Sequence, residues 1–412
     1  MDKEKINTKR EAAHGETGRH RLPRSIWILG LVSLFMDTSS ELVHSLLPVF
    51  MASVLGASMT TIGIIEGIAE ATVAVTKVFS GALSDYLGRR KLLAVLGYGL
   101  AALSKPIFPL AQSIGWVFTA RFVDRVGKGI RGAPRDALVA DIVHSQSRGA
   151  AYGLRQSLDS VGAFLGPLLA IVFLALLNDD IRQVLWIAIV PAILSVGLLV
   201  FGVREPKNVQ VHNGSGIPFS TLSTKRLPSG YWWIVFLGAI FTLARFSEAF
   251  LVLRVQGLGL ELGYVPLVLI VMNVVYTLSA YPAGMVADRS NPLALLVGGL
   301  FILIIADVIL AFASKPELAL VGVALWGLHM GMTQGIFAKL VADAVPADLR
   351  GSAFGIFNLV SGVALLFASV VAGVAWSILG SGATFMIGAG FAFLTVSGLI
   401  AYRPRGQVTR GK

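Results

Sequence analysis

The sequence lacks cysteine and is poor in charged residues. None of its 412 residues is cysteine, which excludes disulfide bonds and thiolate metal sites. Charged residues account for only 14% of the chain and hydrophobic residues for 55%, and the mean hydropathy is +0.76. A surface that faces water on all sides needs more charge than this. The composition therefore predicts a polytopic membrane protein.

The chain also lacks the parts that an enzyme or a signalling protein needs. The sequence contains no Ser-His-Asp arrangement, glycine-rich phosphate loop or quartet of metal ligands. Residues 204–230 form the only long polar stretch between apolar segments, and they are too few for a soluble domain. We therefore expect no enzyme activity and no cofactor. A membrane sensor without transport stays an alternative from a different class.

The net charge of +11 does not indicate a nucleic-acid partner. Many basic residues flank the apolar segments at the two ends of the chain. This placement is the one that orients membrane proteins, and it differs from a basic face that binds DNA. The flanking residues are Lys3, Lys5, Lys9, Arg10, Arg19, Arg21 and Arg24 at one end, and Arg403, Arg405, Arg410 and Lys412 at the other.

Twelve apolar segments are long enough to cross a bilayer, which takes about 20 residues at a rise of about 1.5 Å per residue. The first six lie at roughly 25–54, 58–84, 90–110, 115–142, 149–177 and 183–203. The second six lie at roughly 231–255, 260–287, 293–313, 318–343, 352–377 and 381–402. The pattern predicts an all-α membrane protein with 12 transmembrane helices.

The polar stretches divide the chain into five parts. Residues 204–230, rich in Gly, Pro and Ser, indicate a linker between two six-helix bundles at 25–203 and 231–402. Residues 1–24 and 403–412 are tails. Lys and Arg gather in the turns after the even-numbered spans, so we expect the linker and both tails to be cytoplasmic. We expect a multi-pass protein of the cell (inner) membrane.

An internal repeat supports the two bundles. The stretch VADIVHSQSRGAAYG from Val139 aligns with VADAVPADLRGSAFG from Val341, an offset of 202, and GALSD from Gly81 aligns with GMVAD from Gly284, an offset of 203. Each match lies at the expected cytoplasmic end of a span. The repeat predicts a duplicated, pseudo-symmetric six-helix unit.

These motifs resemble those of the major facilitator superfamily across essentially the whole chain. The loop GALSDYLGRRK, residues 81–91, is similar to the family's G-x-x-x-D-R-x-G-R-R motif, with Tyr86 in place of a basic residue. A weaker second copy begins at Gly284. In the fifth span, GAFLGP at 162–167 resembles the signature of the family's antiporters. The resemblance implies two bundles that rock about a central cavity lined by spans one, four, seven and ten.

The motif residues are predicted to form the conformational gate. Glycine permits close helix approach and tight turns, and an acidic side chain can hold a helix N-terminus in one state and release it in another. Ordinary small-residue packing with a proline kink is the alternative for the fifth span. The predicted gate residues are Gly81, Asp85, Gly88, Arg89, Arg90, Gly284, Asp288, Gly162, Gly166 and Pro167.

Charged residues recur inside the first-half spans at helical spacing. At 100° per residue Asp37, Glu41 and His44 fall within roughly a 60° wedge of the first span, and Glu66, Glu70 and Lys77 within about 40° of the second. A charge at the bilayer centre costs about 2.5–3.5 kcal/mol on insertion scales, so these faces are expected to line a cavity or to pair with cations. The predicted charge partners in the fourth span are Arg121, Asp124, Arg125 and Lys128.

The other intramembrane charges have more ordinary interpretations. Arg155 and Asp159, spaced i and i+4, predict a local ion pair. Lys105 and Arg254 are expected to extend toward the interface. Asp307 is expected to serve in helix packing.

We predict a secondary active transporter that works by alternating access and transports a small molecule or ion. The proton affinity of a carboxylate depends on its neighbours, so rocking can couple transport to protons. The predicted proton-coupling residues are Asp37, Glu41, Glu66 and Glu70. The predicted substrate cavity comprises His44, Arg245, Glu248, Asn273, Tyr276, His329 and Gln334.

The resemblance to antiporters favours proton-coupled export of a small organic compound by a monomer. Two further transport hypotheses remain. Asp37, Glu41 and His44 offer ligands for efflux of a divalent metal ion, although we assign no metal site. Arg121, Arg125 and Arg245 offer positive charge for proton-coupled uptake of an organic anion.

Overall fold

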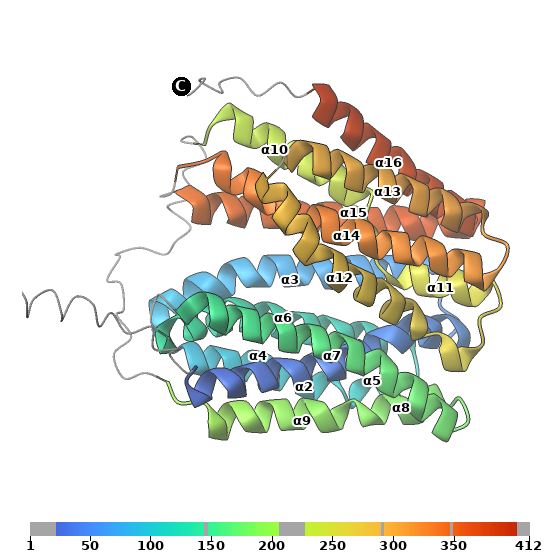
Figure 1. The fold of residues 1–412 in the computed structure, drawn as a ribbon. Coiled ribbons are helices and arrows are strands. Elements are labelled where there is room, and N and C mark those ends of the chain that lie inside the picture. Colours follow the sequence, from blue (N-terminus) through green and yellow to red (C-terminus); the bar gives the residue numbers. More distant parts are fainter. Residues whose placement is uncertain (1–21, 144–146, 206–226, 290–291, 347–348, 402–412) are drawn as a thin grey trace, which may run out of the picture.

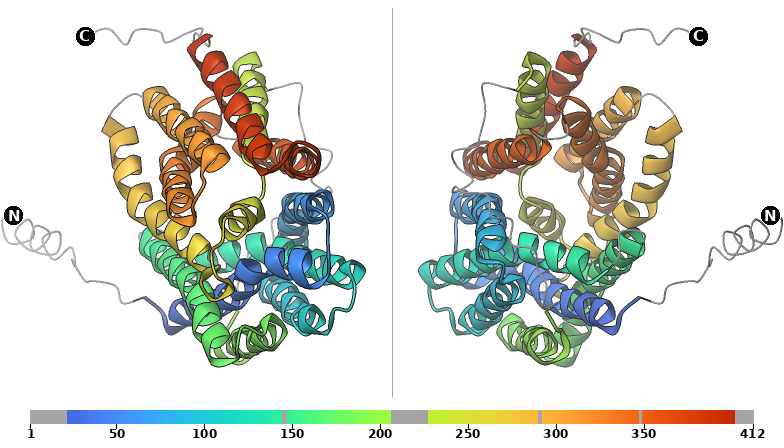
Figure 2. Two further views of the ribbon diagram at one scale, coloured as in Figure 1. Left: turned by 90° about the vertical axis from the view of Figure 1, so that its right-hand side faces the viewer. Right: turned by 90° about the vertical axis from the view of Figure 1, so that its left-hand side faces the viewer.

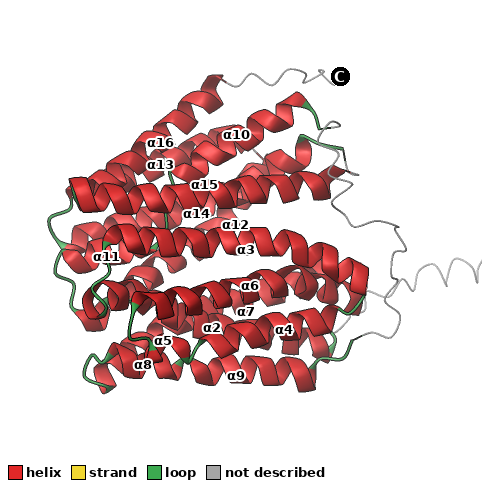
Figure 3. Ribbon diagram, turned by 180° about the vertical axis from the view of Figure 1, so that it is seen from behind, coloured by secondary structure: helices red, strands yellow, loops and turns green. Residues whose placement is uncertain are grey.

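The computed structural model describes residues 22–143, 147–205, 227–289, 292–346 and 349–401. Most of the predicted N-terminal tail, the predicted C-terminal tail, most of the predicted linker and the side chains of Asp85 and Asp288 lie outside this description. In the described ranges the chain folds into helices joined by short loops, with no strand (Figure 3). The helices form two bundles stacked side by side (Figures 1 and 2). This confirms the predicted all-α fold.

The first bundle contains the segments predicted as spans one to six. Several spans consist of consecutive helical pieces: the first ends in a π-helical turn, and the third and sixth are interrupted. The elements are α2 (Arg24–Val49) with η1 (Phe50–Val54), α3 (Met59–Leu87), α4 (Arg90–Ser104) with α5 (Ile107–Leu110), α6 (Ile114–Ile142), α7 (Arg148–Leu176), and α8 (Ile181–Ile187) with α9 (Ile189–Gly197) and η3 (Leu198–Gly202).

The second bundle contains the segments predicted as spans seven to twelve. The elements are α10 (Ser229–Leu243) with α11 (Ala249–Gly257), η6 (Leu262–Tyr264) leading into α12 (Leu267–Arg289), α13 (Pro292–Phe312), α14 (Pro316–Asp343), α15 (Arg350–Leu379) and α16 (Ser381–Ala401). Among the described residues, nine helical segments are long and apolar enough to cross a membrane. The charge-rich helices α3 and α6 are not among these nine, which is consistent with their lining a polar interior.

The two bundles pack by the same scheme. In the first, α2 packs on α7, α3 on α6 and α4 on α6; in the second, α10 packs on α15, α12 on α14 and α13 on α14. Across the boundary α3 packs on α15 and α7 on α12, which are equivalent pairs under the repeat. This correspondence matches the duplication that the internal repeat predicts.

The main departure from the predicted spans is a break in the seventh. The sequence predicts one helix over 231–255, but α10 ends at Leu243 and α11 begins at Ala249. The intervening backbone is anchored from outside the span, because the Ser247 amide donates to Ser369 Oγ at 3.2 Å. Within the span, Ser247 Oγ accepts from the Ala249 amide at 3.3 Å. The break therefore depends on α15 as well as on its own residues.

Two basic residues were expected to extend toward the interface, and one of them, Lys105, does not. Arg254 donates to the carbonyls of Leu310, Ala311 and Ala313 at 2.8–3.1 Å, so it satisfies the C-terminal carbonyls of α13. Lys105 is 1% exposed, and its Nζ lies 2.8 Å from Asp124 Oδ1. The prediction for Lys105 was wrong because the sequence does not reveal the acceptor that its side chain meets inside the fold, whereas Arg254 reaches the end of α13 and the first residue of α16.

One end of the molecule is closed by contacts between the bundles. Thr60 at the start of α3 donates through Oγ1 to Ser377 Oγ at 3.0 Å and to the Gly373 carbonyl at 3.3 Å. Glycines let the α3 and α15 backbones touch along this seam: a Cβ on Gly67 would lie 2.8 Å from the Leu366 carbonyl oxygen. We call this contact the α3–α15 seam.

Asp180 caps α8 at the same end of the molecule. Its Oδ1 accepts from the Gln183 amide at 3.2 Å and its Oδ2 from Gln183 Nε2 at 2.8 Å. These hydrogen bonds favour the charged carboxylate and hold the pKa of Asp180 below its ordinary value.

Candidate functional site

A cavity lies between the two bundles and has two adjoining lobes. Their volumes are about 560 and 320 Å³, and the larger is of the size that takes a small organic ligand. The lobes share the lining residues Glu41, Val73, Lys77, Lys128, Ala163 and Asn273.

The cavity reaches toward the end of the molecule opposite the closed one. The smaller lobe is lined by Arg135 and Asp136, about two turns before the end of α6, and by Gln156, about two turns into α7. These helix ends lie at the same end of the molecule as the start of α2 (Figure 1). The described conformation is thus open toward the predicted cytoplasmic side and closed at Thr60.

The acidic face of α2 points into this cavity. Asp37 lines the smaller lobe and Glu41 lines both, as the helical spacing predicts. Glu41 Oε2 lies 3.4 Å from His44 Nδ1, and Asp37 Oδ1 lies 3.7 Å from Arg131 Nη2. The sequence identified this face but not Arg131 as its partner.

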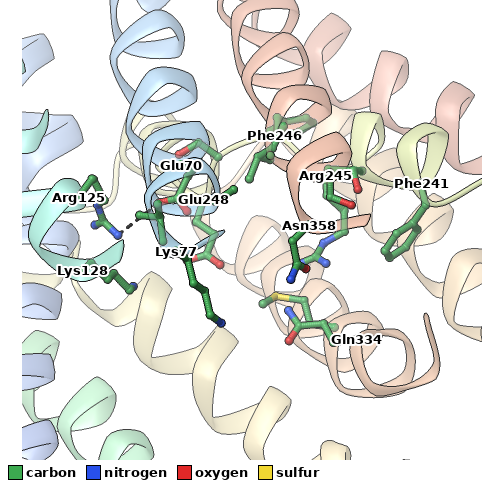
Figure 4. Close-up of a pocket in the computed structure, with 18 of the residues that line it drawn as sticks. Glu70, Lys77, Arg125, Lys128, Phe241, Arg245, Phe246, Glu248, Gln334 and Asn358 are labelled. Carbon is green, nitrogen blue, oxygen red and sulfur yellow. Dashed lines mark ion pairs between the residues drawn. The ribbon is translucent and has the colours of Figure 1, made fainter. Parts of the chain in front are cut away.

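Helices α3 and α6 supply the cations of the first-half wall. Glu70 Oε1 lies 3.4 Å from Arg125 Nη1 (Figure 4). Lys77 and Lys128 project into the same space, and among the described residues neither ammonium group has an ion pair or a hydrogen bond. The wall therefore carries two positive charges that make no direct ion pair within the described part of the chain.

Three predicted site residues lie behind this wall instead of lining it. Arg121 Nη2 lies 2.7 Å from Glu66 Oε2, and both side chains are buried. Asp124 is the buried partner of Lys105, which also donates to Ser40 Oγ at 3.1 Å. These pairs fix the helices that carry the cavity residues.

The break in the seventh span forms the centre of the second-half wall. Arg245 and Glu248 flank it, and both line the larger lobe (Figure 4). The Arg245 guanidinium lies 5.5 Å from the centroid of the Phe241 ring, and its buried Nε has no hydrogen-bond partner in the described chain. Unwound backbone at membrane depth occurs where it lines a cavity, as it does here.

Polar and aromatic side chains complete this wall. Asn273 lines both lobes, and Tyr276 on α12 donates to Gln334 Oε1 on α14 at 3.1 Å. The aromatic rings lie next to Arg245, with the Phe246 and Trp326 centroids 5.6 Å apart. The lining aromatic residues are Phe241, Phe246, Trp326, Phe337 and Phe357.

One predicted cavity residue, His329, is placed elsewhere. Its side chain is fully buried, and its Nδ1 lies 3.0 Å from the Gly299 carbonyl oxygen on α13. It lines neither lobe. The structure gives it a contact between α13 and α14 instead of a place at the substrate.

The predicted gate residues fall into a packing group and a turn group. A Cβ on Gly166 would lie 2.7 Å from the Leu42 amide nitrogen, and one on Gly162 would lie 2.6 Å from the Leu34 carbonyl oxygen. Pro167 is buried within the same helix. These glycines therefore bring α7 against α2 next to Asp37 and Glu41.

At the open end, Gly88 ends α3 with a left-handed φ of 61°, and Arg89 follows it as the cap of α4. Arg90 Nη1 lies 2.7 Å from Asp141 Oδ2 at the end of α6. A Cβ on Gly81 would make an ordinary 3.5 Å contact with Ala133, and one on Gly284 would meet nothing within 4 Å in the described chain. The motif thus ties α4 to α6.

Sequence reasoning missed several lining residues. Lys77 was placed on the inward face with Glu70, seven positions away, but was not assigned to the substrate cavity. Arg131 and Asp159 continue polar stripes already noticed on their helices. Asn358 and the aromatic residues carry no signal that separates them from ordinary packing residues.

The metal hypothesis finds no ready site. Glu41 and His44 meet, and the sequence offers Asp37 as a third ligand. Within the described ranges, no group of three or more His, Cys, Asp or Glu side chains is placed to hold a metal ion.

Two six-helix bundles enclosing a charged cavity that is closed at one end define a membrane transport protein. A family model of the Major Facilitator Superfamily matches residues 29–369 and 249–411. The chain belongs to this family, and its fold and family make it a transporter.

Individual comparisons agree with this assignment. An uncharacterized MFS-type transporter of Methanocaldococcus jannaschii is 30% identical over 92% of this chain and 94% of its own. A gentisate transporter of Corynebacterium glutamicum is 24% identical over 85% of this chain and 81% of its own. The crystal structure of a mutant of the nucleoside transporter NupG superposes with a TM-score of 0.75 at 13% identity, covering 91% of this chain and 99% of that one.

Proposed function

We propose that this protein is a proton-coupled transporter that takes a small organic anion into the cell by alternating access. The observation that carries the proposal is the set of three cavity-lining cations, Lys77, Lys128 and Arg245, that have no ion-pair partner among the described residues. Among the lining carboxylates of the larger lobe, Glu248 has no such partner, and Glu41 has only His44, which is charged only when protonated. The lobe therefore has an excess of unpaired positive charge.

The anion is proposed to bind between the two walls. Lys77 and Lys128 approach it from the first bundle and Arg245 from the second, with aromatic rings beside Arg245. A ligand that contacts both bundles favours their closure around it. The gentisate transporter that the chain resembles is named for a small aromatic anion, which supports this ligand class.

Protons supply the driving force in this proposal. An anion that enters a cell works against a negative-inside potential at a cost of about 2.3 kcal/mol per charge per 100 mV, so a cotransported proton offsets the cost. Asp37 and Glu41 line the cavity beside cations or histidine and are proposed to carry that proton. Export of an organic compound by antiport loses part of its support, because Gly162 and Gly166 are explained by their contact with α2.

We further propose that the protein lies in the cell membrane as a monomer with cytoplasmic termini. The cavity then faces the cytoplasm in the described conformation. The pattern of basic turns supports this orientation.

The test measures uptake of gentisate and benzoate into proteoliposomes, with and without an imposed proton gradient. We expect Lys77→Gln and Lys128→Gln to raise the half-saturation concentration about tenfold each, because losing one partly solvated charge contact costs about 1.4 kcal/mol. Lys315→Gln removes an exposed cation far from the cavity and should leave uptake unchanged. Binding of organic cations in preference to every anion tested would contradict the proposal.

Proton coupling is tested separately with Asp37→Asn and Glu41→Gln. We expect at least one of them to abolish gentisate uptake driven by the proton gradient while gentisate still protects the purified protein against heat. Unchanged proton-driven uptake in both variants would reject their role.

A further inference from the structure

Asp307 is a buried carboxylate to which the proposed transport cycle gives no role. It lies about one and a half turns before the end of α13 and is 0% exposed. Neither Oδ1 nor Oδ2 has a hydrogen-bond partner in the part of the chain that the structure describes. Helix packing, the role expected from the sequence, does not require a carboxylate at this position.

The side chain of Asp307 faces the back of the break in the seventh span. A Cβ placed on Gly388 of α16 would lie 2.8 Å from Asp307 Oδ2, 3.1 Å from Phe246 Cε1 and 3.3 Å from the Ala244 carbonyl oxygen. The space beside Gly388 is thus bordered by the Asp307 carboxylate, by the Phe246 ring and by the Ala244 carbonyl, which belongs to no helix. Phe246 also packs on Phe385 with a centroid distance of 5.4 Å, so the surroundings are largely apolar.

The charged groups on the packed elements do not reach Asp307. Arg254 of α11 is committed to the carbonyls of Leu310, Ala311 and Ala313, beyond the acid along α13. His329 of α14 meets the Gly299 carbonyl, two turns away on the other side. Arg245 and Glu248 in the break line the cavity instead, and α16 carries no titratable residue.

Burying an ionised carboxylate without a partner in such surroundings costs several kcal/mol of free energy, and burying the protonated acid costs much less. We propose that Asp307 is a second proton-binding site, occupied in the described conformation, and that release of its proton is linked to rearrangement of the break at residues 244–248. The site lies behind the cavity wall and is distinct from Asp37 and Glu41.

The proposed link follows from the two sides of the break. At its back, Ala244 and Phe246 lie around the same point beside Gly388 as the Asp307 carboxylate, and its front presents Arg245 and Glu248 to the cavity. Ionised Asp307 needs water or a cation, which a displaced break can admit. Linkage is reciprocal, so a change at the front of the break must alter the proton affinity at its back.

Infrared spectroscopy of the full-length protein tests occupancy. At neutral pH, Asp307→Asn should lose one carboxylic-acid carbonyl band that the wild-type protein shows. Asp180→Asn makes the same chemical change at an exposed helix cap and should keep that band. An unchanged carboxylic-acid region in Asp307→Asn would overturn the proposal.

A second variant covers the case in which Asp307→Asn does not fold. Gly388→Ala places a methyl group next to Oδ2 and should shift the frequency of the same band. Folded Gly388→Ala protein with the wild-type band position would also overturn the assignment.

The link to the break is tested with Ser247→Cys, the only cysteine in such a protein. The rate of thiol labelling should rise with pH more steeply in Ser247→Cys than in Ser247→Cys/Asp307→Asn. At the highest pH tested, the rate for Ser247→Cys should be several-fold the rate for the double variant. Both variants carry the same thiol, so comparing them removes the effect of thiol ionisation on the labelling rate. Parallel pH profiles would show that the break does not respond to Asp307.

Discussion

At the scale of single residues, the ion pairs of the first bundle are of two kinds. Glu70 with Arg125 and Asp37 with Arg131 are loose pairs at 3.4 and 3.7 Å on the cavity surface. Glu66 with Arg121 is a tight pair at 2.7 Å that solvent does not reach. Loose, partly hydrated pairs can exchange partners during transport, whereas a dry pair is suited to holding helices in place.

The buried pair gives a stability prediction. Arg121→Met leaves Glu66 charged, buried and unpaired, and should lower the free energy of unfolding by about 3–5 kcal/mol. The double variant Arg121→Met/Glu66→Met removes both charges and should recover most of that loss. Thermal unfolding in detergent measures both. Additive losses in the double variant would show that the pair is not a unit.

The sequence was informative about which carboxylates lie inside but not about their partners. Helical spacing placed Asp37 and Glu41 on one face, and the cost of charge in lipid required that face to point inward. Pairing depends on helix rotation and height, which spacing alone does not determine. Arg131, and not Arg121, therefore lies beside Asp37.

At the scale of helices, glycines set the distance between α2 and α7. Gly162 and Gly166 face the α2 backbone on the turns that carry Asp37 and Glu41. This explains the sequence motif by packing, and it also makes the position of the two carboxylates depend on α7.

A methyl group at this crossing should be costly. Gly166→Ala brings Cβ to 2.7 Å from both the Leu42 amide nitrogen and the Thr38 carbonyl oxygen, and overpacking of this kind costs about 1–3 kcal/mol. We expect a lower unfolding temperature and impaired proton-driven uptake. Gly153→Ala on the same helix meets nothing within 4 Å among the described residues and should be neutral or stabilising. Equal stability of the two variants would refute the packing role.

The spans could be predicted from the sequence, but the break in the seventh could not. Apolar length alone located the twelve segments. The stretch LARFSEAF, residues 243–250, contains no Pro or Gly to end a helix. Its break is held by Ser369 of α15, a tertiary contact that local sequence does not reveal.

At the scale of the whole molecule, the two bundles meet at one end and enclose the cavity toward the other. The internal repeat predicted two equivalent units, and the shared packing scheme agrees with it. Which end is closed could not be predicted, because both conformations of a transporter share one sequence.

The absence of cysteine allows a direct test of whether the closed end must open during transport. Thr60→Cys/Ser377→Cys replaces two hydroxyls 3.0 Å apart across the α3–α15 seam, and the new thiols have no native competitor. Oxidation should form a disulfide and stop uptake, because the closed end can no longer open, and reduction should restore it. The single variants should be insensitive to oxidant. Full uptake by the cross-linked protein would contradict alternating access at this end.

The α3–α15 seam has a further consequence for coupling. Where glycines bring two backbones together, attraction is short-ranged and falls steeply with separation. The seam is therefore expected to part completely or not at all, without a stable half-open arrangement. While the seam is intact, the cavity has no opening at this end, so a proton that enters from the open end does not pass across the bilayer.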